Sequence, residues 1–305
     1  MRHLLSVLDL SLQEIQEVFA LAVELKTKLA RGEREALFPS RVLALVFDKP
    51  SLRTRVSFET AMIHLGGSSL YLGQDTGWGK GREPISDFAQ VLSQYVDVIA
   101  CRTAGHERIE ELAANSVCPV INGLTDYSHP CQAFADLLTL QEAFGDLKGR
   151  KLAFVGDANN VARSLAEACG RMGMEFAIAA PDGYQFSDAD IRQLKQELPT
   201  LRFEQSDQPD RIVRGASCVY TDVWTSMGQE QEKEARCRAF APFQVNAALM
   251  KLVARDAKFL HCLPAHRGEE VTAEVIDGPQ SAILPEAANR MHVQKALIAW
   301  LLQQT

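Results

Sequence analysis

Short runs of apolar and β-branched residues alternate with helical stretches along most of this chain, and this alternation constrains the fold more than any other feature. In the first half, the apolar runs cover residues 42–47, 69–72, 96–101 and 117–121. Helical spacing of apolar residues marks the stretches between them, at residues 53–65, 85–94 and 107–115. Strand–helix–strand order predicts a parallel sheet covered by helices, because parallel strands need a long crossover connection.

The same pattern returns in the second half, through residues 151–156, 161–172, 175–180, 189–198, 201–204, 218–221 and 259–263. A chain of 305 residues that is 47% hydrophobic can fill two cores of ordinary size. We therefore expect an α/β protein with two tandem domains, each a parallel sheet flanked by helices. The expected domains are residues 1–130 with a C-terminal helix at 286–305, and residues 131–285. Ligands of such sheets bind at the carboxyl ends of the strands and between domains, so we expect the active site in the interdomain cleft.

Composition excludes several classes of protein. The net charge of −7 gives no broad basic face for nucleic acid or an anionic membrane. No segment reaches the roughly 18 apolar residues of a membrane span, so we expect a cytoplasmic protein. The seven cysteines are scattered without a C-x-x-C pair, which argues against a disulfide framework and against a zinc knuckle.

The segment that follows the run at 42–47 has the composition of an oxyanion site. Pro50 ends the strand and Ser51 is placed to cap the next helix, whose first turn carries Arg53, Thr54 and Arg55. Unpaired N–H groups at a helix start, together with hydroxyl and guanidinium groups, suit a phosphate. A capped helix with its arginines in solvent would fit these residues equally well.

Two further positions are expected at the edge of the same sheet. The strand that ends at Cys101 delivers Arg102, whose charge would reach the same anion, although a lone arginine there is more often a surface residue. In His129-Pro130-Cys131-Gln132, Pro130 favours an extended conformation at His129. The imidazole and the Gln132 amide could polarise a carbonyl and bind an amide nitrogen, whereas a lone histidine here would more often cap the helix.

In the second half, the sequence Gly156-Asp157-Ala158-Asn159-Asn160 follows a strand and precedes a helix. It has one glycine where a dinucleotide fingerprint needs three, so NAD binding is disfavoured. The two asparagines suit a carboxylate and an amine instead. Asp222 ends a later strand and could hold an ammonium group beside the loop 226–228, although a solvated loop fits equally well.

The last segment of interest is His261-Cys262-Leu263-Pro264. Cys262 could be a nucleophile, but no residue at a known spacing supplies its base. An orienting or proton-accepting role near an amine is the interpretation we favour.

Together these segments resemble the aspartate/ornithine carbamoyltransferase superfamily over essentially the whole chain. Residues 51–55 are similar to its S-x-R-T-R motif and residues 129–132 to its H-P-x-Q motif. Residues 222–228 resemble the D-x-x-x-S-M-G loop, and residues 261–264 the H-C-L-P segment, of the branch that uses ornithine. The resemblance implies transfer of a carbamoyl group from carbamoyl phosphate to the δ-amine of L-ornithine, giving L-citrulline and phosphate, without metal or cofactor.

The resemblance also implies a role for each matching residue. The residues implied to bind carbamoyl phosphate are Ser51, Leu52 through its backbone, Arg53, Thr54, Arg102, His129, Gln132, Cys262, Leu263 and Arg290. Those implied to be catalytic are Arg102, His129, Cys262 and Arg290. Those implied to bind ornithine are Asn160, Asp222, Ser226 and Met227, with Asp222 on the α-amino group and the δ-amine kept away from fixed negative charge. The resemblance further implies a cis bond before Pro264 and a homotrimer or a multiple of trimers.

Three departures from the family pattern bear on the acceptor. Leu52 replaces a usual threonine, and Arg163 stands where many relatives have histidine. The loop 74–83 contains Trp78, and a tryptophan there occurs in relatives that use acylated ornithines. Putrescine and N-acylornithine therefore stay open as acceptors, although residues 226–228 favour ornithine. Outside this activity, a non-catalytic binding paralogue and a nicotinamide dehydrogenase are the alternatives.

Overall fold

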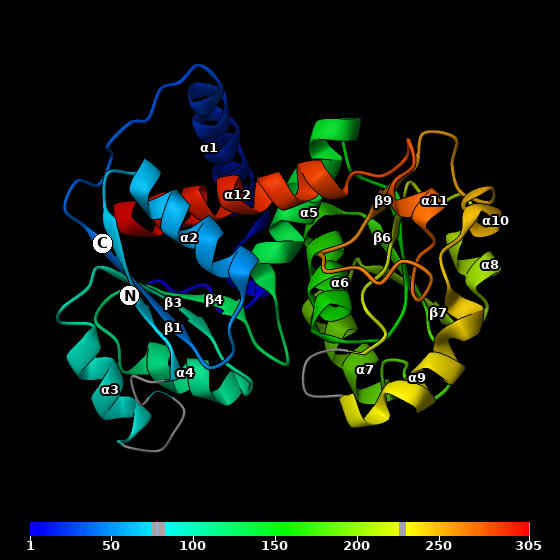
Figure 1. Ribbon diagram of the computed structural model, residues 1–305, viewed down its shortest axis with the longest axis horizontal. Helices are drawn as coiled ribbons and strands as arrows, with labels where there is room; N and C mark the ends of the chain where they lie inside the picture. Colours follow the sequence, from blue (N-terminus) through cyan, green and yellow to red (C-terminus); the bar gives the residue numbers. More distant parts are fainter. Residues whose placement is uncertain (75–77, 79–82, 226–229, 305) are drawn as a thin grey trace. The chain divides into compact units, whose positions relative to one another are not determined.

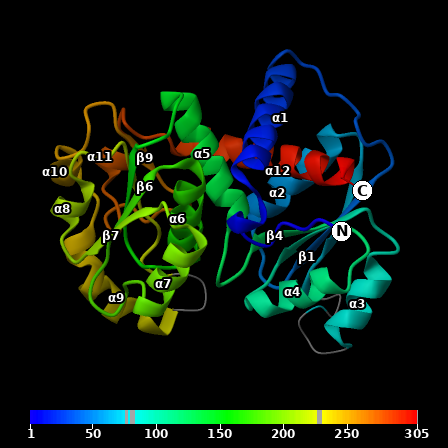
Figure 2. The same ribbon diagram turned by 180° about the vertical axis from the view of Figure 1, so that it is seen from behind.

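The computed structural model describes residues 1–74, 78, 83–225 and 230–304 (Figures 1 and 2). The chain divides into two compact units, which we call the first unit (Met1–Ala135 and Ala288–Thr305) and the second unit (Asp136–Ala287). Both passages of the chain from one unit to the other fall inside helices, α5 (Pro130–Phe144) and α12 (Ile283–Gln303). No helix within the described ranges is long and apolar enough to cross a membrane.

The first unit contains a parallel sheet of four strands in the order β2-β1-β3-β4. Its strands are β1 (Val42–Phe47), β2 (Ser68–Leu72), β3 (Val98–Arg102) and β4 (Val120–Leu124). Its helical elements, besides its parts of α5 and α12, are η1 (Val7–Asp9), α1 (Leu12–Ala30), α2 (Leu52–His64), α3 (Ile85–Leu92) and α4 (His106–Ala114). Helices α3 and α4 cover one face of the sheet, and α1, α2 and α12 lie on the other (Figures 1 and 2).

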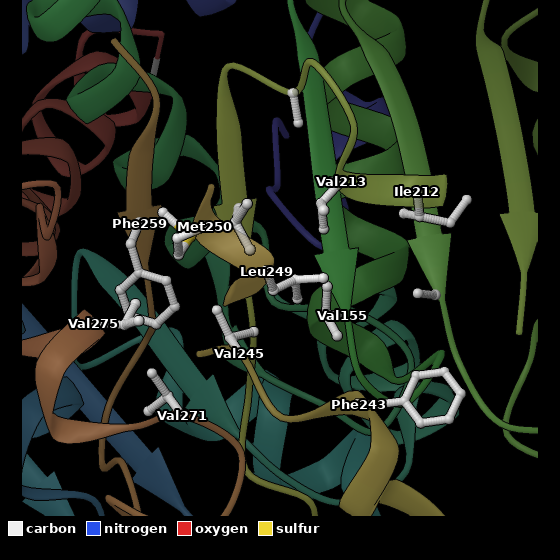
Figure 3. Close-up of a cluster of buried hydrophobic side chains, with 14 of the residues drawn as sticks. Val155, Ile212, Val213, Phe243, Val245, Leu249, Met250, Phe259, Val271 and Val275 are labelled. Atoms are coloured by element: carbon white, nitrogen blue, oxygen red, sulfur yellow. The ribbon is translucent and has the colours of Figure 1, made fainter. Parts of the chain in front are cut away.

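The second unit contains a parallel sheet of five strands in the order β7-β6-β5-β8-β9. Its strands are β5 (Lys151–Val155), β6 (Glu175–Ala179), β7 (Arg202–Ser206), β8 (Cys218–Tyr220) and β9 (Lys258–Leu260). Its further helical elements are α6 (Asn160–Met172), α7 (Asp188–Glu197), α8 (Pro209–Val213), η3 (Glu230–Glu232), α9 (Lys233–Phe240), η4 (Ala241–Phe243), α10 (Ala247–Met250) and α11 (Ala273–Ile276). One face of the sheet packs on α8 to α11, where Val155 and Phe259 meet Val213, Leu249 and Val275 (Figure 3).

Two parallel sheets flanked by helices confirm the predicted fold class. Strand limits differ by a few residues from the predicted runs, most in β4, which covers Val120–Leu124 rather than 117–121. Strand β3 covers Val98–Arg102 rather than 96–101. The carboxylate of Asp97, the residue before β3, accepts the backbone N–H of Val42 at 2.7 Å and pairs with Arg41, while its own N–H donates to the Val42 carbonyl at 2.9 Å. The shift places Arg102 in the sheet itself, opposite Phe47.

Strand order identifies where a ligand would bind in each unit. In the first unit the chain starts at β1, adds β2 on one side and then returns to place β3 on the other. In the second unit it starts at β5, adds β6 and β7, and then returns to place β8 on the opposite side. Such reversals leave a crevice at the carboxyl ends of the two central strands, which is where open α/β sheets bind their ligands. Each of the segments after β1, β3, β5 and β8 contains residues that the sequence predicted for the site.

Candidate active site

The loop after β1 leads into a capped helix, as predicted. Helix α2 begins at Leu52, and the Ser51 hydroxyl accepts the backbone N–H of Thr54 at 3.4 Å. The Leu52 side chain is 77% exposed, so this residue offers the site its backbone and little else. The N-terminus of a helix attracts anions through its unpaired N–H groups and its dipole.

Thr54 is the residue on which the predicted site of the first unit converges. Its buried hydroxyl oxygen accepts hydrogen bonds from Nη1 of Arg102 (3.5 Å) and Nη2 of Arg290 (3.3 Å), and it lies 3.0 Å from the Ser51 hydroxyl, to which it is hydrogen bonded. Nη1 of Arg290 also donates to the Gln132 side-chain oxygen. Two guanidinium groups that meet at one neutral oxygen repel each other, and an anion bound beside them would relieve that repulsion. This arrangement therefore suits an oxyanion.

His129 is buried next to these two arginines. Burial lowers the pKa of His129 well below its ordinary value, and the charges of Arg290 and Arg102 lower it further. The imidazole is therefore neutral at pH 7 and can hydrogen bond to a carbonyl oxygen without adding a third positive charge.

The two arginines of the α2 motif behave differently from each other. Arg55 pairs with Glu59 at 3.0 Å and lies 4.0 Å from the ring centre of Tyr71, so other residues already engage it. Arg53 is exposed, and among the described residues it has no hydrogen bond or ion pair. The side chains in contact at Thr54 are thus Ser51, Arg102 and Arg290, and Arg53 is left open to solvent.

In the second unit, Asn159 joins the two segments that follow β5 and β8. Its side-chain oxygen caps α6 by accepting the N–H groups of Val161 and Ala162, both at 3.0 Å. Its amide nitrogen donates to Oδ2 of Asp222 at 3.0 Å. Asn160, the residue predicted to bind a ligand, is half-buried at the first position of the helix. The sequence analysis did not assign Asn159 this role, although an asparagine just before a helix start is a cap signal.

Asp222 is in direct contact with Cys262. Its Oδ1 accepts the Cys262 thiol at 3.2 Å and the backbone N–H of Val223 at 2.8 Å. Burial raises the pKa of Cys262 well above its ordinary value, and the negative charge of Asp222 raises it further. Cys262 is therefore a protonated donor, which argues against its being a nucleophile or a proton acceptor.

The contact between Asp222 and Cys262 also concerns which end of ornithine each residue was expected to bind. Asp222 was expected at the α-amino group and Cys262 beside the δ-amine, which are opposite ends of the ligand. The structure places the Asp222 carboxylate against the Cys262 thiol, so the two residues expected at opposite ends of ornithine lie next to each other. Which end of ornithine each residue binds stays a prediction.

The turn that carries Cys262 is held by acids that the sequence analysis missed. The N–H of His261 donates to Glu286 at 2.9 Å, and Nδ1 of His261 accepts the N–H of Leu263 at 2.9 Å. Nε2 of His261 must therefore carry the proton, which it donates to Glu270 at 3.2 Å. Burial raises the pKa of Glu286 well above its ordinary value, and the neighbouring Asp136 raises it further. The predicted cis bond between Leu263 and Pro264 is confirmed.

Some predicted residues contribute less, or lie outside the described ranges. Ser226 and Met227 belong to residues that the structure does not describe. Trp78 is 3% exposed and packs on Phe88 with ring centres 5.0 Å apart, so the core of the first unit accounts for its presence without an acyl group. Arg163 pairs with Asp190.

A metal has a poor set of ligands here. Asp222, His261 and Cys262 offer ligand atoms within 4.8 Å of one another. Both ring nitrogens of His261 are already hydrogen bonded, and the protonated thiol donates to the carboxylate. The three residues are thus arranged as a hydrogen-bonded network, in which a metal would have to displace existing partners.

Comparisons with known proteins agree with this geometry. The carbamoyl-P binding domain of aspartate/ornithine carbamoyltransferase matches residues 2–142, and the Asp/Orn binding domain matches residues 148–301. The ornithine carbamoyltransferase of Bacillus subtilis is 50% identical over 304 residues, which are 99% of this chain and 94% of that protein. The solved ornithine carbamoyltransferase of Pyrococcus furiosus has a TM-score of 0.96 at 45% identity and covers 100% of this chain and 98% of its own. A solved anabolic ornithine carbamoyltransferase of Campylobacter jejuni has a TM-score of 0.92 at 34% identity, with both chains fully covered. This chain therefore belongs to the aspartate/ornithine carbamoyltransferase family.

Proposed function

We propose that this chain transfers the carbamoyl group of carbamoyl phosphate to the δ-amine of L-ornithine, producing L-citrulline and phosphate. The observation that carries the proposal is the convergence of Ser51, Arg102 and Arg290 on Thr54 at the start of α2. This cluster has the charge and the donors that a phosphate and a developing oxyanion require. Carbamoyl phosphate is therefore assigned to the first unit and ornithine to the second.

In the first unit, the phosphate lies on the N–H groups of the first turn of α2 and on the Ser51, Arg53 and Thr54 side chains. Arg102 bridges the phosphate and the carbamoyl oxygen, and Arg290 reaches the same oxygen. Gln132 holds the carbamoyl nitrogen through its side-chain oxygen, and neutral His129 donates to the carbamoyl oxygen.

The reaction forms a bond between the amine nitrogen and the carbonyl carbon and breaks the bond from that carbon to the phosphate oxygen. An alkyl ammonium has a pKa of about 10.4 in water, so it must release one proton to water before it can attack, and the departing phosphate takes the second proton from the nitrogen. The tetrahedral intermediate carries its negative charge on the former carbonyl oxygen, beside Arg102 and Arg290. Removal of one such donor commonly costs on the order of 10²–10³ in rate.

In the second unit, Asn160, Asp222, Ser226 and Met227 bind ornithine. The Asp222 carboxylate also holds the amine end, because it contacts the Cys262 thiol at 3.2 Å. The ammonium donates to Asp222 and to the Leu263 carbonyl until its proton is lost. Cys262 remains a neutral thiol and orients the carboxylate.

The acceptor can be tested directly with a colorimetric assay for the carbamoylated product. Ornithine, putrescine, N-acetylornithine and aspartate are compared at equal concentration. The proposal expects ornithine to give the highest kcat/KM, in line with the named relatives and with the packing of Trp78 in the core of the first unit. A higher kcat/KM for N-acetylornithine or putrescine would reassign the acceptor, and no product with any acceptor would reject the transferase.

We further propose that the enzyme is a cytoplasmic homotrimer, which the family resemblance supports. Light scattering after gel filtration should give a mass near three times 33.7 kDa, or a multiple of that trimer. A monomer at micromolar concentration would contradict the proposed assembly.

A further inference from the structure

Asp48 connects the ends of the two central strands of the first unit. It is the first residue after β1, and Thr103 is the first residue after β3. The Asp48 N–H donates to the Arg102 carbonyl at 2.9 Å, and its Oδ2 accepts the Thr103 hydroxyl at 2.5 Å. Nη1 of Arg108, from α4, lies 3.3 Å from the same oxygen. One carboxylate thus ties together the segments that leave β1, β3 and the following helix.

The backbone and these contacts together form a closed ring that includes the phosphate-binding cluster of Ser51, Thr54 and Arg102. From Asp48 the chain runs through Ser51 to Thr54, whose hydroxyl accepts Nη1 of Arg102. Arg102 is followed at once by Thr103, which returns to Asp48 through its hydroxyl. Three non-covalent links close this ring: Nη1 of Arg102 with Thr54, the Asp48 N–H with the Arg102 carbonyl, and the Thr103 hydroxyl with Asp48. Of the two links made by side chains, Asp48–Thr103 is the one that lies outside the cluster.

The chemistry of this outer link favours a fixed geometry. The Asp48 side chain is 14% exposed and Thr103 is buried, so water competes weakly for their hydrogen bond. A hydrogen bond to a carboxylate is shorter and stronger than one between neutral groups. Arg108 balances the charge of Asp48, which removes much of the repulsion that a lone carboxylate would exert on a phosphate nearby.

Residues from the loop after β2 contact Asp48 or its partner Arg108. The Arg108 guanidinium lies 5.0 Å from the ring centre of Trp78, and the Gln74 side chain donates to the Asp48 carbonyl. Trp78 itself packs on Phe88. The position of Asp48 therefore depends on Arg108 and Gln74 as well as on its hydrogen bonds to the segment after β3.

We propose that Asp48 is a positioning residue whose link to Thr103 sets the spacing between the start of α2 and Arg102, and so the affinity for carbamoyl phosphate. The inference rests on the proposed function, because that function assigns carbamoyl phosphate to this cluster. Asp48 acts through Thr54 and Arg102 and does not itself contact the substrate.

The test compares Asp48→Asn and Thr103→Val with substitution of a control carboxylate, Asp97, which contacts the opposite end of β1. Asp97 accepts the N–H of Val42 and pairs with Arg41 where β1 begins, so Asp97→Asn removes a similar anchor away from the cluster. For each variant, calorimetry measures the dissociation constant of carbamoyl phosphate. Steady-state kinetics gives KM for ornithine at saturating carbamoyl phosphate, and thermal unfolding gives the melting temperature.

We expect Asp48→Asn and Thr103→Val to weaken carbamoyl phosphate binding by about tenfold or more, because loss of the link lets Arg102 move away from the start of α2 and weakens its charged hydrogen bonds to the ligand. KM for ornithine should stay within about twofold. Asp97→Asn should lower the melting temperature by a similar amount but leave carbamoyl phosphate affinity within about twofold. Asp48→Glu keeps the charge and both acceptor oxygens and should recover part of the affinity.

Two outcomes separate failure of this inference from failure of the proposed function. If the unmodified protein binds carbamoyl phosphate and forms citrulline, but Asp48→Asn and Thr103→Val behave like Asp97→Asn, the positioning role is wrong. If the unmodified protein neither binds carbamoyl phosphate nor forms citrulline, the proposed function itself fails. Thr103→Val removes a single oxygen, so it decides the question if Asp48→Asn does not fold.

Discussion

The two predicted half-sites occupy the same place in similar sheets but carry opposite charge. In the first unit, Arg102 and Arg290 meet at the Thr54 hydroxyl beside a neutral histidine. In the second unit, the Asp222 carboxylate holds a protonated thiol and an asparagine amide. The shared sheet topology therefore provides only the location, and the loops after the strands decide which ligand charge is stabilised.

The largest effect is expected from the cationic half-site. Arg102→Ala and Arg53→Ala should each abolish tight binding of carbamoyl phosphate and lower kcat/KM by about 10²–10³ or more, because each removes a charged donor to the oxyanion. Arg55→Ala is the control, since Arg55 is engaged by Glu59 and Tyr71. Calorimetry with carbamoyl phosphate measures the affinity. An unchanged dissociation constant in Arg102→Ala would remove the anion site from this cluster.

The acidic half-site should respond to a different ligand. Asp222→Asn removes the charge that attracts the ammonium, so kcat/KM for ornithine should fall by about 10²-fold, as expected when a hydrogen bond to a charged group is lost. The dissociation constant of carbamoyl phosphate should not change. Asp190→Asn, which alters an acid paired with Arg163 in the same unit, serves as the control. An equal loss of carbamoyl phosphate affinity in Asp222→Asn would contradict the separation of the two sites.

The protonation state of Cys262 gives a chemical test of the acidic half-site. Because its pKa is raised, Cys262 should be alkylated by iodoacetamide at pH 8 at least about tenfold more slowly than a free cysteine of pKa near 8.5. Asp222→Asn removes a charge that raises this pKa and should speed the reaction. Peptide mapping by mass spectrometry identifies the modified cysteine. Rapid alkylation of Cys262 in the unmodified protein would show that the site holds a thiolate.

A smaller effect is expected from the pH dependence of stability. The pKa of His129 lies below its value in the unfolded chain, near 6.5, so protonation favours unfolding. Stability should be unaffected by this group above pH 6.5 and should fall as the pH drops below that value. Urea midpoints between pH 5 and 7 should therefore decline less in His129→Gln than in the unmodified protein. A parallel decline in both would indicate that His129 titrates normally.

Much of the fold could be predicted from the sequence because strand and helix periodicity are local signals. The alternation of apolar runs and helical stretches predicted both parallel sheets. The exact limits of the strands could not be predicted, because they depend on pairing with residues far away in the sequence, as in the contacts of Asp97 with Val42 and Arg41.

The site was predictable to the extent that its residues follow strands or belong to compact motifs. Ser51, Arg102 and Asp222 were identified by their positions after strands, whereas Arg290 was identified only by resemblance. Asp136, Glu270 and Glu286 were missed, because their roles depend on contacts between distant segments that no local pattern reveals.

The central claim is that the Thr54 cluster binds carbamoyl phosphate, and the most direct test is calorimetric titration of that ligand into the unmodified protein and into Thr54→Val without ornithine. Valine matches threonine in size but lacks the hydroxyl on which Ser51, Arg102 and Arg290 converge. We predict that the unmodified protein binds carbamoyl phosphate and that Thr54→Val weakens binding by about 10²-fold, in the range found for removal of one oxyanion donor. Equal affinity in the two proteins would contradict the account.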